Sequence, residues 1–381
     1  MTWTKAIGQE RIKEILQKAI LDGRVPHAYC FWGDEGTGKE AIALEFAKTM
    51  NCEHPLKNGD NVEYCGVCSS CQLAASLSHP NIELIFSTPA AKPDGGKETG
   101  LKNKQIDEIT SQLQIKSENY YHKIEVKGGN MIRIGSIRNL RKKLSMSQGI
   151  RGHRVIIVSR AEEMTTESAN AFLKTLEEPH DNVTIILTTS RKEMLLPTIL
   201  SRCQVIHFSE LMKEDIANYI NNYYDISPDD AVLAASFSQG SLTRAIDFIS
   251  EDMQAMREEA INMLRTALKK REYKINLSKS IDELTKDKSK RKVEQFLNIL
   301  LLWVRDVEVY KNTLSEEHLI NSDQKEIFEK FIKAFGNANI ASAIFVIENT
   351  IGRIRRNVPL NLLLLSMFIE LRIVLFNNTE L

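Results

Sequence analysis

Residues 27–40 read HAYCFWGDEGTGKE, and this stretch decides the fold. Its first part, His27 to Trp32, is an aromatic and apolar run typical of a buried strand. A helix is predicted from Lys39 to Met50, because the apolar residues of this segment fall on one helical face. Between the two lies the Gly-x4-Gly-Lys spacing of a phosphate-binding loop, in the strand-to-helix context that such a loop requires.

Glycines in a P-loop let backbone N–H groups face the phosphates of a nucleotide, and the helix N-terminus adds positive potential. The residues predicted to bind nucleotide in this loop are Gly33, Gly36, Thr37, Gly38 and Lys39. One position departs from the pattern, because Glu40 stands where a Ser or Thr hydroxyl normally holds Mg²⁺. The loop therefore predicts a nucleotide site that is vestigial in its chemistry, without efficient hydrolysis.

A hydrolytic site also needs an acidic residue at the end of a neighbouring apolar strand, to hold Mg²⁺ and orient water. The matching strand is Val155 to Val158, and Ser159 and Arg160 follow it. Glu162 and Glu163 lie just beyond and are predicted to be exposed charges before a helix. The acidic ligand is therefore missing, and together with the substitution in the loop this indicates a degraded ATPase.

Apolar strands and amphipathic helices alternate through the first half of the chain, which predicts an α/β domain on a mostly parallel sheet. Further strands are expected at Val183 to Thr189 and at Val205 to Phe208, and a helix at Glu167 to Glu178 that Pro179 stops. Residues 87–130 are rich in Lys, Gly, Ser and Asn, and we interpret them as an inserted surface excursion that carries little chemistry.

Helices replace strands after Phe208. At 381 residues the chain exceeds the length of one ordinary domain of about 100–200 residues, so several domains are expected. The expected division is a P-loop domain at 1–208, a short helical domain at 209–252 and a longer helical domain at 253–381. The apolar stripe along Lys290 to Tyr310 is interpreted as a core face of the last domain.

The composition is that of an ordinary folded protein, with 43% hydrophobic and 26% charged residues. Fifty basic residues balance fifty acidic ones, which excludes a uniformly basic surface that draws the whole protein onto nucleic acid. The longest uncharged apolar stretch, Val358 to Ile369, is well short of the roughly 20 residues that cross a bilayer. Met1 to Glu10 lacks the pattern of a secretory signal, so a cytoplasmic protein is expected.

Four of the six cysteines crowd into one segment with the spacing Cys52-x12-Cys65-x2-Cys68-x2-Cys71. Cytoplasmic cysteines are normally reduced, so this spacing indicates metal ligation before disulfides. Four thiolates suit tetrahedral zinc and leave no open position for water. One structural Zn²⁺ is therefore expected at about residues 52–71, without a contribution from the nearby His54 and His79.

Several short motifs occur along the chain in one order. They are His27-Ala28-Tyr29, the P-loop, the cysteine cluster, His79-Pro80-Asn81, the run from Ala169 to Pro179 and the run from Leu196 to Cys203. In this order they resemble the bacterial clamp-loader subunits of the AAA+ superfamily, specifically the delta prime subunits of DNA polymerase III. The Leu-Lys-Thr-Leu-Glu-Glu-Pro and Ser-Arg-Cys stretches carry the specificity, and the resemblance covers residues 1 to about 250.

The resemblance implies a role in DNA replication. In that family, ATP-hydrolysing motor subunits form a hetero-pentameric ring with a delta and a delta prime subunit, and the ring loads a sliding clamp on primed DNA. Delta prime is the non-hydrolysing member, which fits the missing metal ligands. The resemblance implies that residues 209–252 form a helical lid domain and that residues 253–381 form a C-terminal collar domain for oligomerisation. Whether the chain itself binds ATP stays open.

Single residues also acquire roles from the resemblance. Arg202 is implied to be an arginine finger that reaches into the ATP site of a neighbouring subunit, where its rigid fork of donors meets phosphate oxygens. Thr188 and Thr189 fall where the family carries its sensor between strand and phosphate. Gly240 to Arg244 resembles the second sensor, but Thr243 stands in the place of the family's arginine, which leaves the role of Arg244 open.

Two other interpretations remain. One is an ATP-hydrolysing motor subunit of the same loader, which Glu40, Ser159 and Arg160 disfavour. The other is a nucleoside monophosphate kinase with a zinc-bearing lid, a class that also combines a P-loop with four cysteines. Kinases of that kind carry their cysteines further downstream as two Cys-x2-Cys pairs and lack two extra helical domains.

Overall fold

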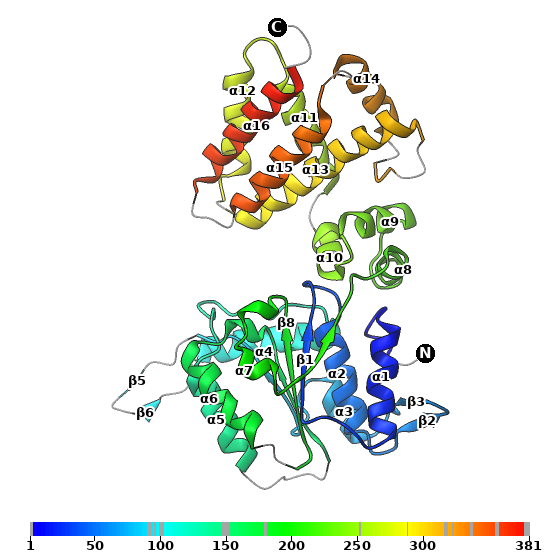
Figure 1. Ribbon diagram of the computed structural model, residues 1–381, viewed down its shortest axis with the longest axis vertical. Helices are drawn as coiled ribbons and strands as arrows, with labels where there is room; N and C mark the ends of the chain where they lie inside the picture. The colour runs from blue at the N-terminus through cyan, green and yellow to red at the C-terminus, as the bar shows by residue number, and fades with distance from the viewer. Residues whose placement is uncertain are drawn as a thin grey trace. The chain divides into compact units, whose positions relative to one another are not determined.

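The computed structural model describes residues 3–89, 93–94, 97–98, 103–145, 152–178, 181–250, 253–287, 289–315, 319–321, 324–335, 338–354 and 358–376. The chain forms two compact units, and each is described by itself (Figure 1). The first comprises Met1–Asp225 with Gln239–Arg244, and the second Ile226–Ser238 with Ala245–Leu381. The expected division at residues 208 and 252 stays a prediction.

A five-stranded parallel sheet forms the centre of the first unit, which confirms the predicted α/β fold. Its strands lie in the order β4 (Ile82–Ile85), β7 (Arg154–Val158), β8 (Val183–Thr189), β1 (Ala28–Trp32) and β9 (Gln204–His207). Strand β1 runs beside β8 from the pair Ala28 and Ile185 to the pair Trp32 and Thr189. The strand ends therefore meet at one edge, where open α/β sheets bind their ligands.

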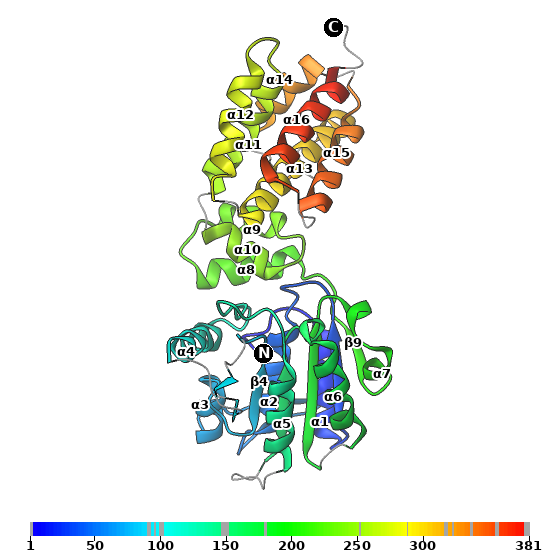
Figure 2. The same ribbon diagram turned by 90° about the vertical axis from the view of Figure 1, so that its left-hand side faces the viewer.

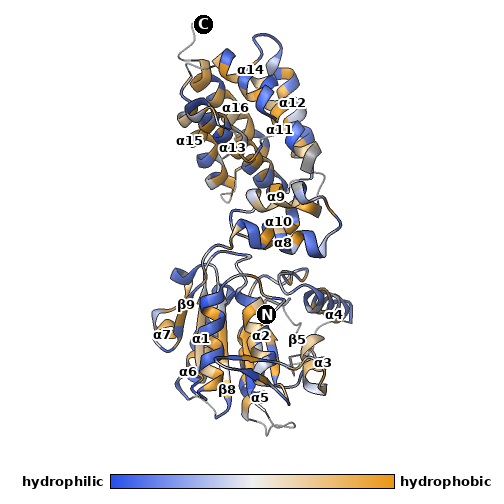
Figure 3. Ribbon diagram, turned by 90° about the vertical axis from the view of Figure 1, so that its right-hand side faces the viewer, coloured by the Kyte–Doolittle hydropathy of each residue, from blue (hydrophilic) through white to orange (hydrophobic). Residues whose placement is uncertain are grey.

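Helices cover both faces of this sheet (Figure 1). The helices of the unit are α1 (Glu10–Leu21), α2 (Lys39–Met50), α3 (Ser69–Ala75), α4 (Asn103–Glu118), α5 (Ile134–Ser145), α6 (Thr166–Glu177), α7 (Pro197–Leu200) and α8 (Lys213–Tyr223), with short 3-10 turns η1 (Ala161–Glu163) and η2 (Lys192–Met194). The period-2 alternation of β1 separates the two cores. Tyr29 packs on Phe46 of α2, while Cys30 is buried with Phe172 of α6 on the other face. Figure 3 shows hydrophobic residues along α2 and β8.

Helix α6 begins one residue earlier than predicted, because Thr165 caps it by accepting a hydrogen bond from the Ser168 N–H at 3.2 Å. It ends at Glu177, and Pro179, the predicted stop, lies outside the described residues. Two small two-stranded pairs complete the unit, and neither joins the central sheet. They are β2 (Leu56–Asn58) with β3 (Asn61–Glu63), and β5 (Pro93–Asp94) with β6 (Lys97–Glu98).

Residues 87–130 were expected to form a surface insertion that carries little chemistry, and the structure shows that this expectation is wrong. It contains the 16-residue helix α4 and, after it, a segment that enters the sheet domain. Lys116, Tyr120, Tyr121 and Ile124 are all buried. The polar composition did not reveal this burial, because two of the buried polar groups, the Lys116 ammonium and the Tyr121 hydroxyl, bond to Glu40 and Ile7 in distant parts of the chain.

The second unit is helical, as predicted (Figure 2). Its helices are α9 (Pro228–Phe237), α11 (Met253–Ala267), α12 (Tyr273–Leu284), α13 (Lys290–Thr313), α14 (Lys325–Phe335), α15 (Ile340–Ile354) and α16 (Leu360–Phe376), while α10 (Leu242–Ser250) begins in the first unit. The apolar stripe of α13 is buried along its length, which confirms it as a core face. Within the described residues no single helix is both long and apolar enough to span a membrane, although α14 and α15 together pass that test across a sharp bend.

A fully buried carboxylate lies in α2. Burial raises the pKa of Glu45 to about 7, against the opposing influence of Lys48 and Tyr64. The folded protein therefore binds a proton more tightly than the unfolded chain does, whose glutamate titrates near 4.5. The contribution of Glu45 to stability consequently falls as the pH rises from 4.5 to 7 and is constant above that range.

We predict that Glu45→Gln stabilises the protein at pH 8, because the amide removes the cost of burying a charge. The gain is on the order of 3 kcal/mol, and it disappears toward pH 4.5, where both states are protonated. Denaturant unfolding across this pH range measures the difference. Glu14→Gln, at an exposed position of α1, is the control and shows no such trend. A pH-independent difference for Glu45→Gln would contradict the prediction.

Candidate functional site

The predicted P-loop connects the C-terminal end of β1 to the N-terminus of α2. Gly36 and Gly38 have φ angles of 80° and 93°, which favour glycine. A Cβ atom on Gly36 would lie 2.2 Å from the Ser241 hydroxyl oxygen, so this backbone is also closely approached by another segment. Both glycines are thus required by the conformation of the loop.

The lysine and threonine of the loop turn inward. Lys39 donates hydrogen bonds to the carbonyl oxygens of Gly33 at 2.6 Å and Asp34 at 2.5 Å, and burial lowers its pKa. The Thr37 hydroxyl donates to the Asp34 carbonyl at 2.8 Å. The groups expected to face a nucleotide are therefore occupied by the loop itself.

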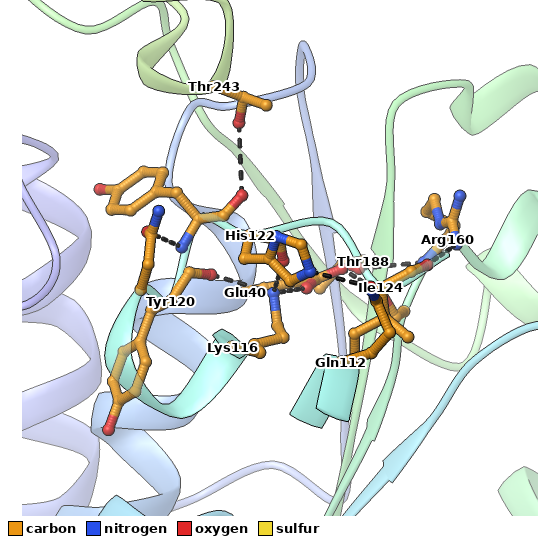
Figure 4. Close-up of polar contacts among 12 residues, drawn as sticks. Glu40, Gln112, Lys116, Tyr120, His122, Ile124, Arg160, Thr188 and Thr243 are labelled. Carbon is orange, nitrogen blue, oxygen red and sulfur yellow. Dashed lines mark hydrogen bonds and ion pairs between the residues drawn. The ribbon is translucent and has the colours of Figure 1, made fainter. Parts of the chain in front are cut away.

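Glu40, at the position of the Mg²⁺-binding hydroxyl, forms an ion pair with Lys116 of α4 at 2.5 Å (Figure 4). The Ser159 hydroxyl donates a second hydrogen bond to the same carboxylate. Burial alone would raise the pKa of Glu40, but Lys116, the Ser159 hydroxyl and Arg160 together outweigh burial and hold the pKa below its usual range. Lys116 also donates to the carbonyl oxygens of Tyr120 at 3.0 Å and His122 at 2.7 Å. The Lys116 ammonium thus neutralises this carboxylate.

The charged residues that follow β7 form hydrogen bonds and an ion pair within the domain. Arg160 pairs with Glu163 at 3.1 Å and donates to the Ile124 carbonyl at 2.8 Å. Glu162 accepts hydrogen bonds from the backbone and hydroxyl of Ser190. The expectation that Glu162 and Glu163 are exposed is wrong, since both are half-buried and both are bonded within the domain.

The two threonines expected at the sensor position end β8, and both are buried. Thr188 accepts a hydrogen bond from the Arg160 N–H at 3.2 Å, and Thr189 accepts one from the Arg191 N–H at 3.0 Å. Together with Gly38, Lys39 and Glu40 they line a cavity of about 80 Å³. Of the residues predicted to bind nucleotide, Gly36, Gly38, Lys39 and Thr189 line this cavity, whereas Gly33 and Thr37 do not. The space holds a few water molecules, and the nucleotide-binding role of these residues stays a prediction.

Lys116, Tyr121 and Thr243 also line this cavity, and sequence reasoning missed the first two. For Tyr121 the signal in the sequence was the aromatic and basic run Tyr120 to Lys123, which is unusual in an otherwise polar segment, whereas no pattern indicated Lys116. Thr243 donates to the Tyr121 carbonyl at 3.5 Å (Figure 4). Arg244 is exposed and its guanidinium donates to Gln239 at 3.3 Å, away from the cavity lining.

Arg202 lies between α7 and the edge strand β9. Its guanidinium donates to the Thr198 carbonyl at 2.8 Å and pairs with Glu177 at the end of α6 at 2.9 Å. The side chain is about one-third exposed. It is therefore accessible to a partner, and its resting contacts lie within its own chain.

The four clustered cysteines come together in space. Cys52 follows α2, Cys65 follows β3, and Cys68 and Cys71 lie at the start of α3. Their sulfur atoms all lie within 4.8 Å of one another. Backbone N–H groups of Cys65, Cys68 and Cys71 donate to the sulfurs of Cys52, Cys65 and Cys68 respectively, at 3.2 to 3.4 Å. Such bonds stabilise thiolates, so the cluster fits a tetrahedral metal ion.

A buried polar network ties this cluster to the domain. Ser70, between two of the cysteines, donates to the Asn51 carbonyl at 2.5 Å and lies 2.8 Å from His79 Nε2. The other ring nitrogen of His79 accepts from the Asn81 N–H at 3.1 Å, just before β4. His79 is therefore a buried linking residue beside the cluster, and a bound metal would brace the connection between α2 and β4.

We predict that protein purified without added metal carries about one equivalent of bound metal at these cysteines, because a closed thiolate site contributes its binding energy to folding. Chelation should lower the thermal unfolding midpoint, and Cys68→Ser should lower both metal content and midpoint. Cys203→Ser, outside the cluster, is the control for metal content. Elemental analysis measures the metal content, and calorimetry measures the unfolding midpoint. A metal-free preparation that keeps full stability would contradict the prediction.

Comparisons with known proteins connect the chain to subunits of DNA polymerase III. A family described as DNA polymerase III, delta subunit, matches residues 8–212. The DNA polymerase III subunit delta' of Bacillus subtilis is 27% identical over 351 residues, with 92% of each chain covered. The corresponding subunit of Pseudomonas aeruginosa is 30% identical over 185 residues, which cover 48% of this chain and 44% of that one.

The DNA polymerase III subunit tau of Bacillus subtilis is also similar, at 26% identity over 250 residues. That similarity covers 64% of this chain and 36% of the relative. The family match, by contrast, spans more than half of this chain and includes both the P-loop and the cysteine cluster. The chain therefore belongs to the DNA polymerase III delta subunit family.

Proposed function

We propose that this chain is the delta prime subunit of a DNA polymerase III clamp loader, a cytoplasmic stator that does not hydrolyse ATP itself. In this role it joins the motor subunits and delta in a hetero-pentamer that places a sliding clamp on primer-template DNA. The observation that carries the proposal is the pairing of Glu40 with Lys116, where a motor subunit would coordinate Mg²⁺.

The motor alternative is less well supported. The similarity to delta' extends over 92% of both chains, whereas that to tau covers 36% of the tau chain. Glu40 is already neutralised, and Ser159 donates to it where a motor subunit has an acidic strand end. The kinase alternative is disfavoured by the cysteines, which lie directly after α2.

The proposed role of Arg202 rests on its position and chemistry. It lies beside an edge strand, is partly exposed, and forms a surface ion pair with Glu177. Exposed pairs of this kind contribute about 0–1 kcal/mol, so a neighbour's triphosphate can replace Glu177 as the partner of the guanidinium. Arg202 thus supports catalysis in trans, while this chain's own pocket performs none.

Zinc is the metal proposed for the cysteine cluster. Cys52, Cys65, Cys68 and Cys71 supply soft thiolate ligands and no oxygen ligand, which suits Zn²⁺ better than Mg²⁺ or Ca²⁺. Four protein ligands leave no position for a reacting water, so the ion has a structural role.

The isolated chain is predicted to show negligible ATP turnover, because neither loop nor strand offers an oxygen ligand free to hold Mg²⁺. Steady-state hydrolysis over a protein concentration series measures this, with a motor subunit as the positive control. Sustained turnover near 1 per second, within the rough range typical of enzymes, would restore the motor interpretation.

Arg202→Ala is predicted to act only in the assembly. The free energy of unfolding of the isolated chain should change by no more than about 0.5 kcal/mol, since the side chain is partly exposed. Reconstituted loaders should lose part of their DNA-stimulated ATPase activity and of their clamp loading. The loss should be smaller than the factors of about 10³ to 10⁵ in rate that an arginine finger contributes at a single site, because the other ATP sites keep their own fingers. Arg191→Ala, at an exposed position after β8, is the matched control. Normal loading by the Arg202→Ala assembly would refute the finger assignment.

A further inference from the structure

The last residues of α4 and the segment that follows it, Lys116 to Lys123, line the P-loop pocket, and we refer to them as the plug. Within it, the Tyr121 hydroxyl accepts a hydrogen bond from the Ile7 N–H at 3.0 Å. A Cβ atom on Gly38, the N-cap of α2, would lie 3.0 Å from the same oxygen. The Tyr121 side chain therefore lies against the helix N-terminus that a P-loop offers to phosphate groups.

The opposite side of the loop is covered as well. Leu242 donates its N–H to the Gly36 carbonyl at 3.1 Å, and the neighbouring Ser241 hydroxyl lies close to the Gly36 backbone. Thr243 reaches across to the Tyr121 carbonyl (Figure 4). The glycines that give a P-loop its open backbone are thus in contact with protein on both sides.

The charges around the pocket are also paired internally. Lys116 holds Glu40, and Lys123 lies 3.1 Å from Glu35 and 3.2 Å from Glu125. The other cations are Arg160, which pairs with Glu163, and Lys39, which is bound by loop carbonyls. A triphosphate that enters has to displace these partners before any cation can meet its oxygens.

The N-terminal segment holds the plug in place. Lys5 donates to the Ser117 carbonyl at 2.7 Å and lies over the ring of Tyr120. Gln9 donates to the carbonyl oxygens of Thr37 at 3.1 Å and Ser209 at 2.6 Å. Residues from three distant parts of the chain therefore converge on one closed arrangement.

We propose that the plug is an internal ligand of the P-loop, and that it adds to the loop's own contacts at Lys39 and Thr37 in keeping nucleotides out. Gly36 and Gly38 keep positive φ angles, and the loop still leads into the N-terminus of α2, which is the part of a P-loop that attracts phosphate. Removal of the Tyr121 ring and of the Glu40–Lys116 charges should therefore uncover a site for a nucleoside diphosphate with Mg²⁺. This inference deepens the proposed function, since it names what closes the pocket of the non-hydrolysing subunit, but it does not depend on Arg202.

The test is titration of the purified chain, residues 1–381, with ADP and Mg²⁺ in a calorimeter. The variants are Tyr121→Ala and the triple variant Tyr121→Ala with Glu40→Thr and Lys116→Met. The two charges are removed together because either one alone would be left unpaired beside the buried plug. Tyr219→Ala is the matched control, because its ring touches Tyr121 and it does not line the cavity.

The wild type and Tyr219→Ala should show no binding at millimolar ADP. The triple variant should bind at least about tenfold more tightly than the wild-type detection limit, with Tyr121→Ala in between. The thermal transition shows whether the triple variant folds. If it does not, the test rests on Tyr121→Ala, which alters no charge. Wild-type binding with a Kd below about 0.1 mM would overturn the proposal, and so would a folded Tyr121→Ala that binds no ADP. Both outcomes are independent of the Arg202→Ala loading assay, so the two proposals can fail separately.

Discussion

The ion pair between Glu40 and Lys116 is the interaction on which the rest of the site depends. It joins the first turn of α2 to the end of an insertion helix more than seventy residues away in the sequence. Lys116 has a side-chain exposure of 1%, and its ammonium has a carboxylate and two carbonyl oxygens as partners. A buried ammonium is costly unless it is paired and hydrogen-bonded, and this arrangement meets both conditions. The segment that carries it is thereby fixed against the P-loop.

Several features follow from that attachment. With the insertion anchored, Tyr121 covers the N-terminus of α2. Arg160, which follows β7, donates a hydrogen bond to the Ile124 carbonyl of the insertion. On the other end of α2, the cysteine cluster and the His79 network connect this helix to β4. Helix α2 is thus held at both ends by groups that need no nucleotide. A P-loop domain built in this way suits the proposed role, in which Arg202 is presented to a neighbouring subunit from a rigid domain.

The sequence predicted the sheet domain well, because each of its signals is local. The glycine spacing after His27 to Trp32, the β-branched run at Val183 to Thr189 and the cysteine spacing all depend on residues close together in the chain. The departure at Glu40 was also visible, and with it the loss of a metal ligand. Its partner was not visible, because nothing in the pattern of residues 87–130 indicates which lysine reaches a carboxylate across the fold. The burial of Glu162 and Glu163 was missed for the same reason, since both are satisfied by tertiary contacts.

A double-mutant cycle on Glu40 and Lys116 tests the central claim most directly. It compares the free energies of unfolding of the wild type, Glu40→Gln, Lys116→Met and the double variant at neutral pH. If the pair holds the insertion on the P-loop, each single variant is less stable than the wild type. The loss of stability in the double variant is then smaller than the sum of the two single losses. The coupling energy should exceed about 1 kcal/mol, within the range measured for contacting residues. Additivity within about 0.5 kcal/mol would contradict the account, because Glu40 and Lys116 would then act independently.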